Sequence, residues 1–326
     1  MDPLFSDLVG QPQAVSLLEA ALSHRRVAPA YLFAGPEGVG RRLAALRFLE
    51  GVLQGGQDDR RERRRLEARN HPDLLWVEPS YSHQGRLIPR SEAEEAGVSK
   101  RTPPQLRLDQ IREVSRFLAR QPLESPRGLV VIEDPEAMAE SAANALLKTL
   151  EEPGHGLLIL LSAAPERLLT TIRSRCQQIS FQRLNPEQMQ TVLAGLDGEQ
   201  RAQAAAALEL PELRALAAGS PGALLNHASF WEAVPDALRD RLTVLPSQPA
   251  EALALARDVT EALNGEQQLW LISWWQHHLW YHQGQSQGLK RLERLRSHLL
   301  SFVQPRLAWE VTLLDLLTSG SSKVSL

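Results

Sequence analysis

Three glycines and two arginines form a segment with the spacing of a phosphate-binding loop. Gly35, Gly38 and Gly40 precede Arg41 and Arg42, and glycines at such spacing let backbone N–H groups face a phosphate at the start of a helix. A hydrolysing loop also needs a lysine for the terminal phosphates and a hydroxyl for Mg²⁺. Arginines stand at both places, and a guanidinium has no acceptor for a cation. The segment therefore indicates a degenerate nucleotide site, with a plain strand-to-helix turn as the alternative.

Two carboxylates follow an apolar run that is typical of a buried strand. Residues 129–132 are followed by Glu133, Asp134 and Pro135. The C-terminal end of such a strand is where a nucleotide-hydrolysing sheet places the carboxylates that hold Mg²⁺. Acidic residues before a proline are equally typical of the end of a strand, so the pair alone does not indicate catalysis.

These groups need a scaffold, and the sequence predicts an α/β one. Apolar runs at 30–34, 128–132 and 157–161 alternate with patterns of helical period, which predicts a parallel, doubly wound sheet. Only helical patterns continue after Phe181. We therefore predict an α/β P-loop domain, a small helical domain and an all-α C-terminal domain. Their predicted ranges are 1–184, with an irregular insertion at about 54–104, then 185–246 and 247–326.

Composition restricts the function classes. The 326 residues include 36 Lys+Arg and 39 Asp+Glu, a net charge of −3, which argues against nucleic-acid binding driven by overall charge. The run from Arg60 to Arg65 could still contact DNA phosphates, and a solvated charge run is the alternative. Cys176 is the single cysteine, so we expect neither a disulfide framework nor a thiolate zinc site. Without a basic leader or a long apolar run, we expect a cytoplasmic protein with no membrane contact.

Several segments carry a family resemblance. Asn144–Pro153, Pro165–Leu169 and Thr171–Cys176 closely resemble the signature of clamp-loader AAA+ subunits. Phe5–Gln11 and His71–Leu74 are similar to the bacterial branch of that family. The resemblance implies an AAA+ P-loop domain with a parallel sheet, a helical lid, and a helical collar that joins a ring of subunits in the DNA polymerase III clamp loader.

The family contains motor subunits that hydrolyse ATP and a delta-prime branch that resembles them without hydrolysing. This chain departs from the motor pattern at Arg41 and Arg42, and in the order of Glu133 and Asp134. Gly222 stands where the motors have a second-sensor arginine. Losing these groups removes most of the charge stabilisation that phosphoryl transfer needs. The resemblance therefore implies a non-hydrolysing stator of the delta-prime branch that needs no cofactor, with an active ATPase motor and a DNA-binding adaptor as alternatives.

In this family, the arginine of the Ser174-Arg175-Cys176 motif enters the ATP site of a neighbouring subunit as an arginine finger in trans. The resemblance implies this catalytic role for Arg175, whereas a surface arginine in general more often pairs with a carboxylate. An arginine supplied in trans can raise hydrolysis by about 10³ to 10⁵. The implied partners are motor subunits of the gamma/tau type, the delta subunit, the sliding clamp indirectly, and primed DNA within the complex.

The stretch that corresponds to the zinc module of the relatives has either lost its metal or been replaced. Relatives carry four cysteines after the P-loop helix, whereas Glu50 to His71 contains none. We therefore predict no metal site, and we expect His71 to be a capping or core residue rather than a ligand.

A cluster of aromatic residues lies towards the C-terminal end. Trp270, Trp274, Trp275, Trp280 and Tyr281 share one helical stretch and give it apolar surface on more than one side. Such a helix must be covered by the chain's own core or by another subunit. The resemblance implies that this domain packs into the collar, so we expect both roles together.

Overall fold

The described chain is made of two compact units. The computed structural model describes residues 3–54, 60–93, 95–98, 103–244, 246–283, 286–301 and 303–320. The first unit comprises 1–98, 104–195 and 219–222, and the second comprises 99–103, 196–218 and 223–326. The domain boundaries at 184 and 246 stay predictions from the sequence.

A five-stranded, entirely parallel sheet forms the centre of the first unit. Its order is β2 (Leu74–Val77), β5 (Leu129–Glu133), β6 (Leu157–Ser162), β1 (Ala30–Ala34) and β7 (Gln177–Ser180). The predicted parallel sheet is confirmed, and β1, β5 and β6 lie at the three apolar runs. The sequence pattern does not predict β2 and β7, because each has four residues and β7 is mostly polar and exposed.

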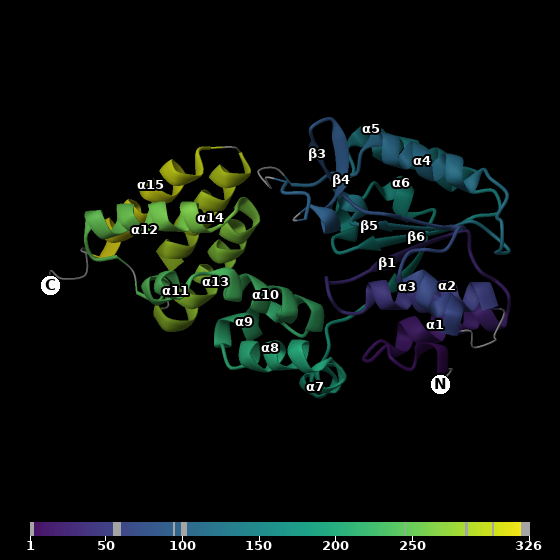
Figure 1. The fold of residues 1–326 in the computed structure, drawn as a ribbon, viewed down its shortest axis with the longest axis horizontal. Coiled ribbons are helices and arrows are strands. Elements are labelled where there is room, and N and C mark those ends of the chain that lie inside the picture. The colour runs from purple at the N-terminus through teal and green to yellow at the C-terminus, as the bar shows by residue number, and fades with distance from the viewer. Residues whose placement is uncertain are drawn as a thin grey trace. The chain divides into compact units, whose positions relative to one another are not determined.

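Helices cover both faces of this sheet, as Figure 1 shows. α1 (Pro12–Ser23), α2 (Arg41–Gln54) and α3 (Arg60–Glu67) lie on one face, and α4 (Leu108–Leu118), α5 (Glu140–Glu151) and α6 (Thr170–Arg173) lie on the other. Both layers are required because β1 and β6 are buried along their whole length, and a parallel sheet is normally covered on each face. Because the strands are parallel, the C-terminal ends of the central strands meet at one edge of the sheet.

The region predicted as an irregular insertion is folded, which corrects that prediction. Besides α3 and β2 it contains an antiparallel hairpin, β3 (Ser80–His83) and β4 (Arg86–Pro89), and the 3-10 helix η2 (Arg90–Glu92). Backbone hydrogen bonds of 3.0 and 3.1 Å between Ser80 and Gln105 fix the base of the hairpin. These elements are short and polar, so their sequence pattern is weak. Residues 55–59, 94 and 99–102 of the insertion lie outside the described residues.

Short elements complete the first unit. The 3-10 helices η1 (Pro3–Phe5), η3 (Pro135–Ala137) and η4 (Pro165–Arg167) lie at its turns, and α7 (Pro186–Ala194) follows the last strand. The Asn185 side chain caps α7 by accepting a hydrogen bond of 2.8 Å from the Gln188 N–H, which satisfies one of the unpaired donors at the start of the helix.

The second unit is helical in its described residues. Its elements are α8 (Gly198–Leu208), α9 (Pro211–Ala217), α10 (Pro221–Ala233, which begins in the first unit), α11 (Asp236–Leu242), α12 (Pro249–Ala262), α13 (Gly265–Gln283), α14 (Ser286–Leu300) and α15 (Pro305–Gly320). Four of them begin with proline, which has a helical φ and needs no hydrogen-bond acceptor at that position. None of the described helices combines the length and apolar character needed to cross a membrane.

Most of the aromatic cluster is buried inside the second unit itself. Trp270, Trp274 and Trp275 of α13 are 7%, 3% and 0% exposed. Trp280 and Tyr281, at the end of the same helix, are 60% and 69% exposed. The chain's own helices therefore cover most of the aromatic surface for which the sequence predicts a collar contact. Only Trp280 and Tyr281 of this cluster are exposed to solvent.

Candidate functional site

The glycine-rich loop joins the end of β1 to the start of α2. Gly38 and Gly40 adopt φ angles of 74° and 103°, a conformation that glycine adopts without the strain of a side chain. Two consecutive carbonyl groups of the loop accept hydrogen bonds from a segment far along the chain. Ser220 Oγ donates to the Glu37 oxygen over 2.6 Å, and the Gly222 N–H donates to the Gly38 oxygen over 3.1 Å. The loop is therefore fixed by the chain itself.

Gln11 holds the next carbonyl of the loop. Its Nε2 donates to the Val39 oxygen over 3.1 Å and to the Gln182 oxygen over 2.8 Å. Its Oε1 accepts the Gln182 N–H over 2.9 Å. Gln11 is 3% exposed, and both ends of its amide are used. This side chain thereby joins the glycine loop to the segment that leaves β7.

Arg41 is a buried cation at the start of α2. It is 7% exposed, and its Nη1 has no hydrogen-bond partner among the described residues. Burial lowers the pKa of the Arg41 guanidinium, while the carboxylates of Asp134, Glu136, Glu37 and Glu133 act in the opposite direction. Arg41 is therefore placed to balance the acidic groups at this edge of the sheet.

Three other arginines surround the carboxylates at the end of β5. Arg90 Nη1 donates to Asp134 Oδ2 over 2.5 Å, and Arg90 Nη2 donates to Glu133 Oε2 over 3.4 Å. Arg69 Nη2 donates to Glu133 Oε1 over 3.2 Å, and Arg42 Nε lies 3.7 Å from the same oxygen. Both carboxylates are thus paired with guanidinium groups of this chain. We call these five residues, together with Trp76, the arginine–carboxylate cluster.

Trp76 of β2 lies between two of these arginines. Its indole Nε1 donates to Glu133 Oε1 over 2.6 Å. The Cζ atoms of Arg69 and Arg42 lie 4.7 and 5.3 Å from the ring centroid, within the range of cation–π attraction. The tryptophan therefore both occupies a carboxylate oxygen and orients two cations beside it.

Glu78 connects Arg69 to the segment that carries Arg90. Its Oε1 accepts a hydrogen bond of 3.2 Å from Arg69 Nη1 and one of 2.5 Å from Ser91 Oγ, and its Oε2 accepts one of 3.2 Å from the Ser91 N–H. Ser91 follows Arg90, so these bonds set the direction from which Arg90 reaches the carboxylates. Sequence reasoning missed Arg69, Trp76 and Arg90, because contacts between residues so far apart leave no periodic signal in a single sequence.

Arg175 lies on a turn between α6 and β7, with a side chain 36% exposed. Its Nη2 donates to Glu151 Oε1 over 2.8 Å, and its Nη1 donates to the Thr171 oxygen over 3.0 Å. The structure thus brings together the glycine loop and the β5 carboxylates, while the polar contacts of Arg175 are with Glu151 and Thr171.

The predicted basic run forms α3, and part of it is ion-paired. Arg63 Nε donates to both Glu50 carboxylate oxygens over 3.0 Å. Arg65 Nη1 donates to Glu124 Oε2 over 2.7 Å. The side chain of Arg60 lies outside the described residues. These pairs reduce the positive charge that the run can offer to a phosphate backbone.

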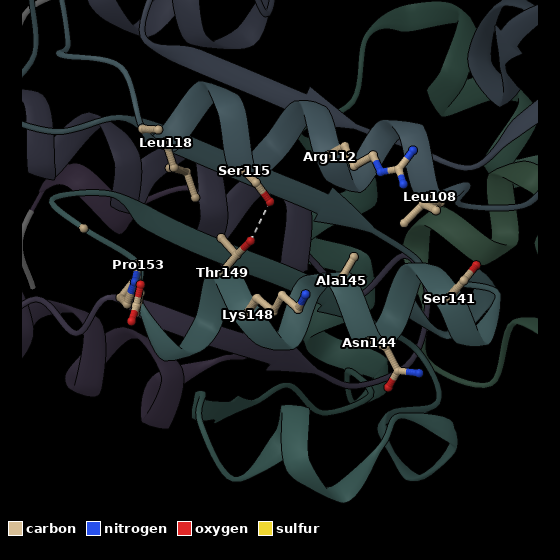
Figure 2. A pocket seen from close by; sticks show the side chains of 13 residues that line it. Leu108, Arg112, Ser115, Leu118, Ser141, Asn144, Ala145, Lys148, Thr149 and Pro153 are labelled. Atoms are coloured by element: carbon tan, nitrogen blue, oxygen red, sulfur yellow. Dashed lines mark hydrogen bonds between the residues drawn. The ribbon is translucent and has the colours of Figure 1, made fainter.

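A groove of 720 Å³ runs between α4 and α5, and Figure 2 shows the side chains along it. Arg112, Lys148 and Asn144 contribute charge and hydrogen-bonding groups to its lining. Ser115 Oγ and Thr149 Oγ1 are hydrogen-bonded over 2.7 Å and join the two helices. Basic and amide side chains are among the groups that contact phosphate oxygens in nucleic acids.

Family comparisons cover most of the chain. The family described as "DNA polymerase III, delta subunit" matches residues 10–185, which is more than half of the 326 residues. The family described as "Cyanobacterial DNA polymerase III delta prime, C-terminal domain" matches residues 187–316. The two matches are adjacent and do not overlap.

Individual relatives agree with these families. The DNA polymerase III subunit delta' of Bacillus subtilis is 34% identical over 193 residues, which are 57% of this chain and 52% of that protein. The subunit delta' of Pseudomonas aeruginosa is 33% identical over 238 residues, 67% of this chain and 64% of that protein. The matched region thus spans between half and two thirds of the length of each relative.

A solved structure shows the same fold. The DNA polymerase III gamma subunit-related protein of Thermotoga maritima superposes with a TM-score of 0.53 at 18% identity, covering 94% of this chain and 99% of that one. The predicted fold class, an α/β domain with a parallel sheet followed by helices, is confirmed. With the family matches reaching from residue 10 to residue 316, this chain belongs to the DNA polymerase III delta-prime family.

Proposed function

We propose that this protein is a non-hydrolysing clamp-loader subunit that supplies Arg175 in trans to the ATP site of a neighbouring motor subunit. The absence of hydrolysis is supported by one observation: Glu133 and Asp134 are paired with Arg90, Arg69 and Arg42. Carboxylates at this position hold Mg²⁺ in hydrolysing sheets. Here guanidinium groups of the same chain donate to both Glu133 oxygens and to Asp134 Oδ2.

The glycine loop supports the same proposal. Mg²⁺-ATP hydrolysis requires a mobile point charge on the terminal phosphates and a hydroxyl on the metal. Arg41 is buried among carboxylates instead, and Arg42 lies over Trp76. The Gly38 carbonyl is bonded to Gly222. These residues do not fit Mg²⁺-ATP, so we derive no catalytic step at this site.

Arg175 supports the second half of the proposal. Its side chain is partly exposed, and it belongs to the turn Ser174–Cys176, whose sequence resembles the finger motif of the clamp-loader family. A guanidinium presents planar donors that match phosphate oxygens and stabilise the charge on a transferring phosphoryl group. The glycine loop would then belong to a site in this chain that does not hydrolyse ATP. Arg175 would act at the ATP site of the neighbouring subunit.

The partners are proposed from the relatives and from two surfaces. The tau subunit of Escherichia coli DNA polymerase III is 28% identical over 280 residues, 82% of this chain and 40% of that protein, and motor subunits of this gamma/tau type and the delta subunit are the proposed neighbours. Exposed Trp280 and Tyr281 are the proposed collar contact. Lys148 and Arg112 in the groove of Figure 2 are the proposed contact with primed DNA held in the complex. The protein would act in the cytoplasm and contact the sliding clamp only indirectly, through the other subunits of the complex.

Two measurements test the proposal. The isolated chain should show no Mg²⁺-dependent ATP turnover; turnover that disappears in Glu133→Gln would instead identify an active motor. In reconstituted complexes that keep only the adjacent motor site active, Arg175→Ala should lower single-turnover hydrolysis by about 10³-fold or more, with ATP affinity unchanged.

A matched variant makes this test specific. Arg173→Ala removes an exposed arginine at the end of α6, two residues before Arg175, and should leave the rate nearly unchanged. Arg175→Lys should restore little activity, because a lysine cannot reproduce the planar set of donors. Equal rates for Arg175→Ala and the unmodified protein would leave a subunit with an architectural role only.

A further inference from the structure

The side chain of Arg175 is held at two points by neighbouring elements. Its Nη2 donates to Oε1 of Glu151, the last residue of α5, over 2.8 Å. Its Nη1 donates to the Thr171 oxygen in α6 over 3.0 Å. The two contacts use different nitrogens of one planar group, so together they fix both the position and the orientation of that plane.

The backbone beneath Arg175 is also well fixed. Its N–H donates to the Ile172 oxygen over 3.1 Å, and Ile172 is 0% exposed in the core beneath the turn. Ser174 Oγ donates to the Thr171 oxygen over 3.2 Å. The backbone of Arg175 is therefore fixed, and the orientation of its guanidinium depends on the contacts that this group makes.

The contacts leave donors available. A guanidinium has five N–H groups, and the described contacts of Arg175 use one on each Nη nitrogen. Among the described residues, the Nε–H and the second N–H of each Nη have no hydrogen-bond partner, on a side chain that is 36% exposed. A free arginine loses rotamer freedom when it binds a phosphate, and one that is already oriented loses less.

We infer that Glu151 is a positioning residue that pre-orients Arg175 for the phosphate oxygens of the neighbouring subunit. This inference rests on the proposed finger role of Arg175. Glu151 acts through the arginine and does not touch the nucleotide. The pair is partly exposed, with side chains 36% and 53% accessible, so the contribution of Glu151 is modest in comparison with that of the finger itself.

The kinetic test uses the reconstituted complex with only the adjacent motor site active. Glu151→Ala should slow single-turnover hydrolysis about threefold to fivefold, the range open to an exposed ion pair, with ATP affinity unchanged. Glu151→Gln keeps an oxygen that can accept from Nη2, so it should restore part of the rate. In the Arg175→Ala background, Glu151→Ala should have no further effect, because the residue acts only through the arginine.

Glu152 provides the matched control. It is the next residue, it is exposed, and it has no ion pair with Arg175. Glu152→Ala should therefore leave the rate unchanged. A rate that rises in Glu151→Ala would show that the carboxylate restrains the finger, and a loss that persists without Arg175 would show a structural role; either result overturns the inference.

A spectroscopic test on the isolated full chain separates this inference from the proposed function. In ¹⁵N-labelled protein, the Nε–H resonance of Arg175, assigned by its loss in Arg175→Lys, should show restricted motion that Glu151→Ala releases and Glu152→Ala does not. If Arg175 is already mobile in the unmodified chain, Glu151 does not position it. If Arg175 is ordered but Arg175→Ala leaves hydrolysis in the complex unchanged, the proposed finger role fails while the contact itself stands.

Discussion

Gly222 lies directly against Gly38 of the glycine-rich loop. A Cβ atom at position 222 would come within 2.7 Å of the Gly38 Cα and 3.2 Å of its carbonyl oxygen, closer than a real side chain tolerates next to backbone. The N–H of Gly222 donates to that same carbonyl. The close approach of the two segments therefore leaves no room for a side chain at position 222.

Replacing Gly222 should loosen the loop. Gly222→Ala forces its new methyl group against the backbone of Gly38, so either the loop or the segment from Gly219 to Gly222 must shift. We expect a loss of about 1 to 3 kcal/mol in the free energy of unfolding of this unit and faster hydrogen exchange at the amides of Gly38 and Gly40. Exchange measured by mass spectrometry on the full chain reports both regions.

Gly198 is the control for this substitution. It is the first residue of α8, and a Cβ atom there would meet nothing within 4 Å. Gly198→Ala should be neutral or stabilising by about 0.4 to 1 kcal/mol, because alanine restricts the unfolded chain. Similar behaviour of the two alanine variants would contradict the view that close packing on Gly38 requires a glycine.

Arg90 should stabilise the first unit, because Arg90→Ala leaves Asp134 without its 2.5 Å partner. Glu133 keeps Arg69 and Trp76, so we expect a moderate loss of about 1 to 3 kcal/mol in unfolding free energy. Arg86→Ala, in the hairpin that precedes Arg90 and exposed, should change stability by less than about 0.5 kcal/mol. Denaturant unfolding of both variants measures the difference. Equal unfolding midpoints would show that Arg90 does not stabilise the first unit.

The central sheet could be predicted from the sequence because its strands are buried on both faces. β1, β5 and β6 are apolar along nearly their whole length, and such runs are recognisable without an alignment. β7 has a single buried residue among its four. An edge strand of that kind is specified by its pairing with β1, and pairing across the chain is not visible in local periodicity.

The candidate site was predictable only in part, for a similar reason. The glycine loop and the pair Glu133-Asp134 are contiguous motifs, so they can be recognised in a single sequence. Arg90 and Trp76 belong to the insertion, whose composition resembles a loop, and their role depends on contacts across 44 and 57 residues. The sequence shows the carboxylates of the site, whereas Arg90 and Trp76, which bond to them, come from a segment that only the fold brings there.

Asp73 should make stability depend on pH in the acid range. Its carboxylate accepts the N–H groups of Leu123, Glu124 and Ser125 at 2.7, 2.8 and 2.8 Å. Burial alone would raise the pKa of Asp73, but these hydrogen bonds outweigh it and hold the pKa below the ordinary value of 3.8. A depressed pKa contributes stability that is complete above about pH 4 and is lost as the pH falls through the folded-state pKa.

Asp73→Asn tests this contribution. The amide cannot accept all three N–H groups and places donors against donors, so we expect a loss of about 2 to 3 kcal/mol at neutral pH. The difference from the unmodified protein should shrink as the pH falls below about 4, because Asp73 becomes protonated first in the unfolded chain and, at lower pH, in the folded protein. Asp109→Asn, at a carboxylate 79% exposed, is the control and should alter neither stability nor its pH profile. A gap between Asp73→Asn and the unmodified protein that is constant down to pH 2 would contradict the assignment.

Trp280 and Tyr281 should matter for assembly and not for folding. They are 60% and 69% exposed, so replacing both with serine removes little buried surface and should change the unfolding free energy by less than about 0.5 kcal/mol. Large aromatic side chains that become buried at an interface often contribute about 2 kcal/mol or more each. We therefore expect the double variant to bind the gamma/tau-type and delta subunits about 30-fold or more weakly, measured by titration with a labelled chain.

Two comparisons make this last test decisive. Leu123→Ser removes an apolar side chain that is 80% exposed in the first unit, and it should leave assembly intact if the collar contact belongs to α13. Trp275→Ser removes a side chain that is 0% exposed in the same helix, so it should destabilise the second unit by about 3 to 5 kcal/mol and weaken assembly only through unfolding. The double variant of Trp280 and Tyr281 should instead combine a normal melting temperature with weak assembly. If it assembles as tightly as the Leu123→Ser control, the two exposed aromatic residues are not the contact.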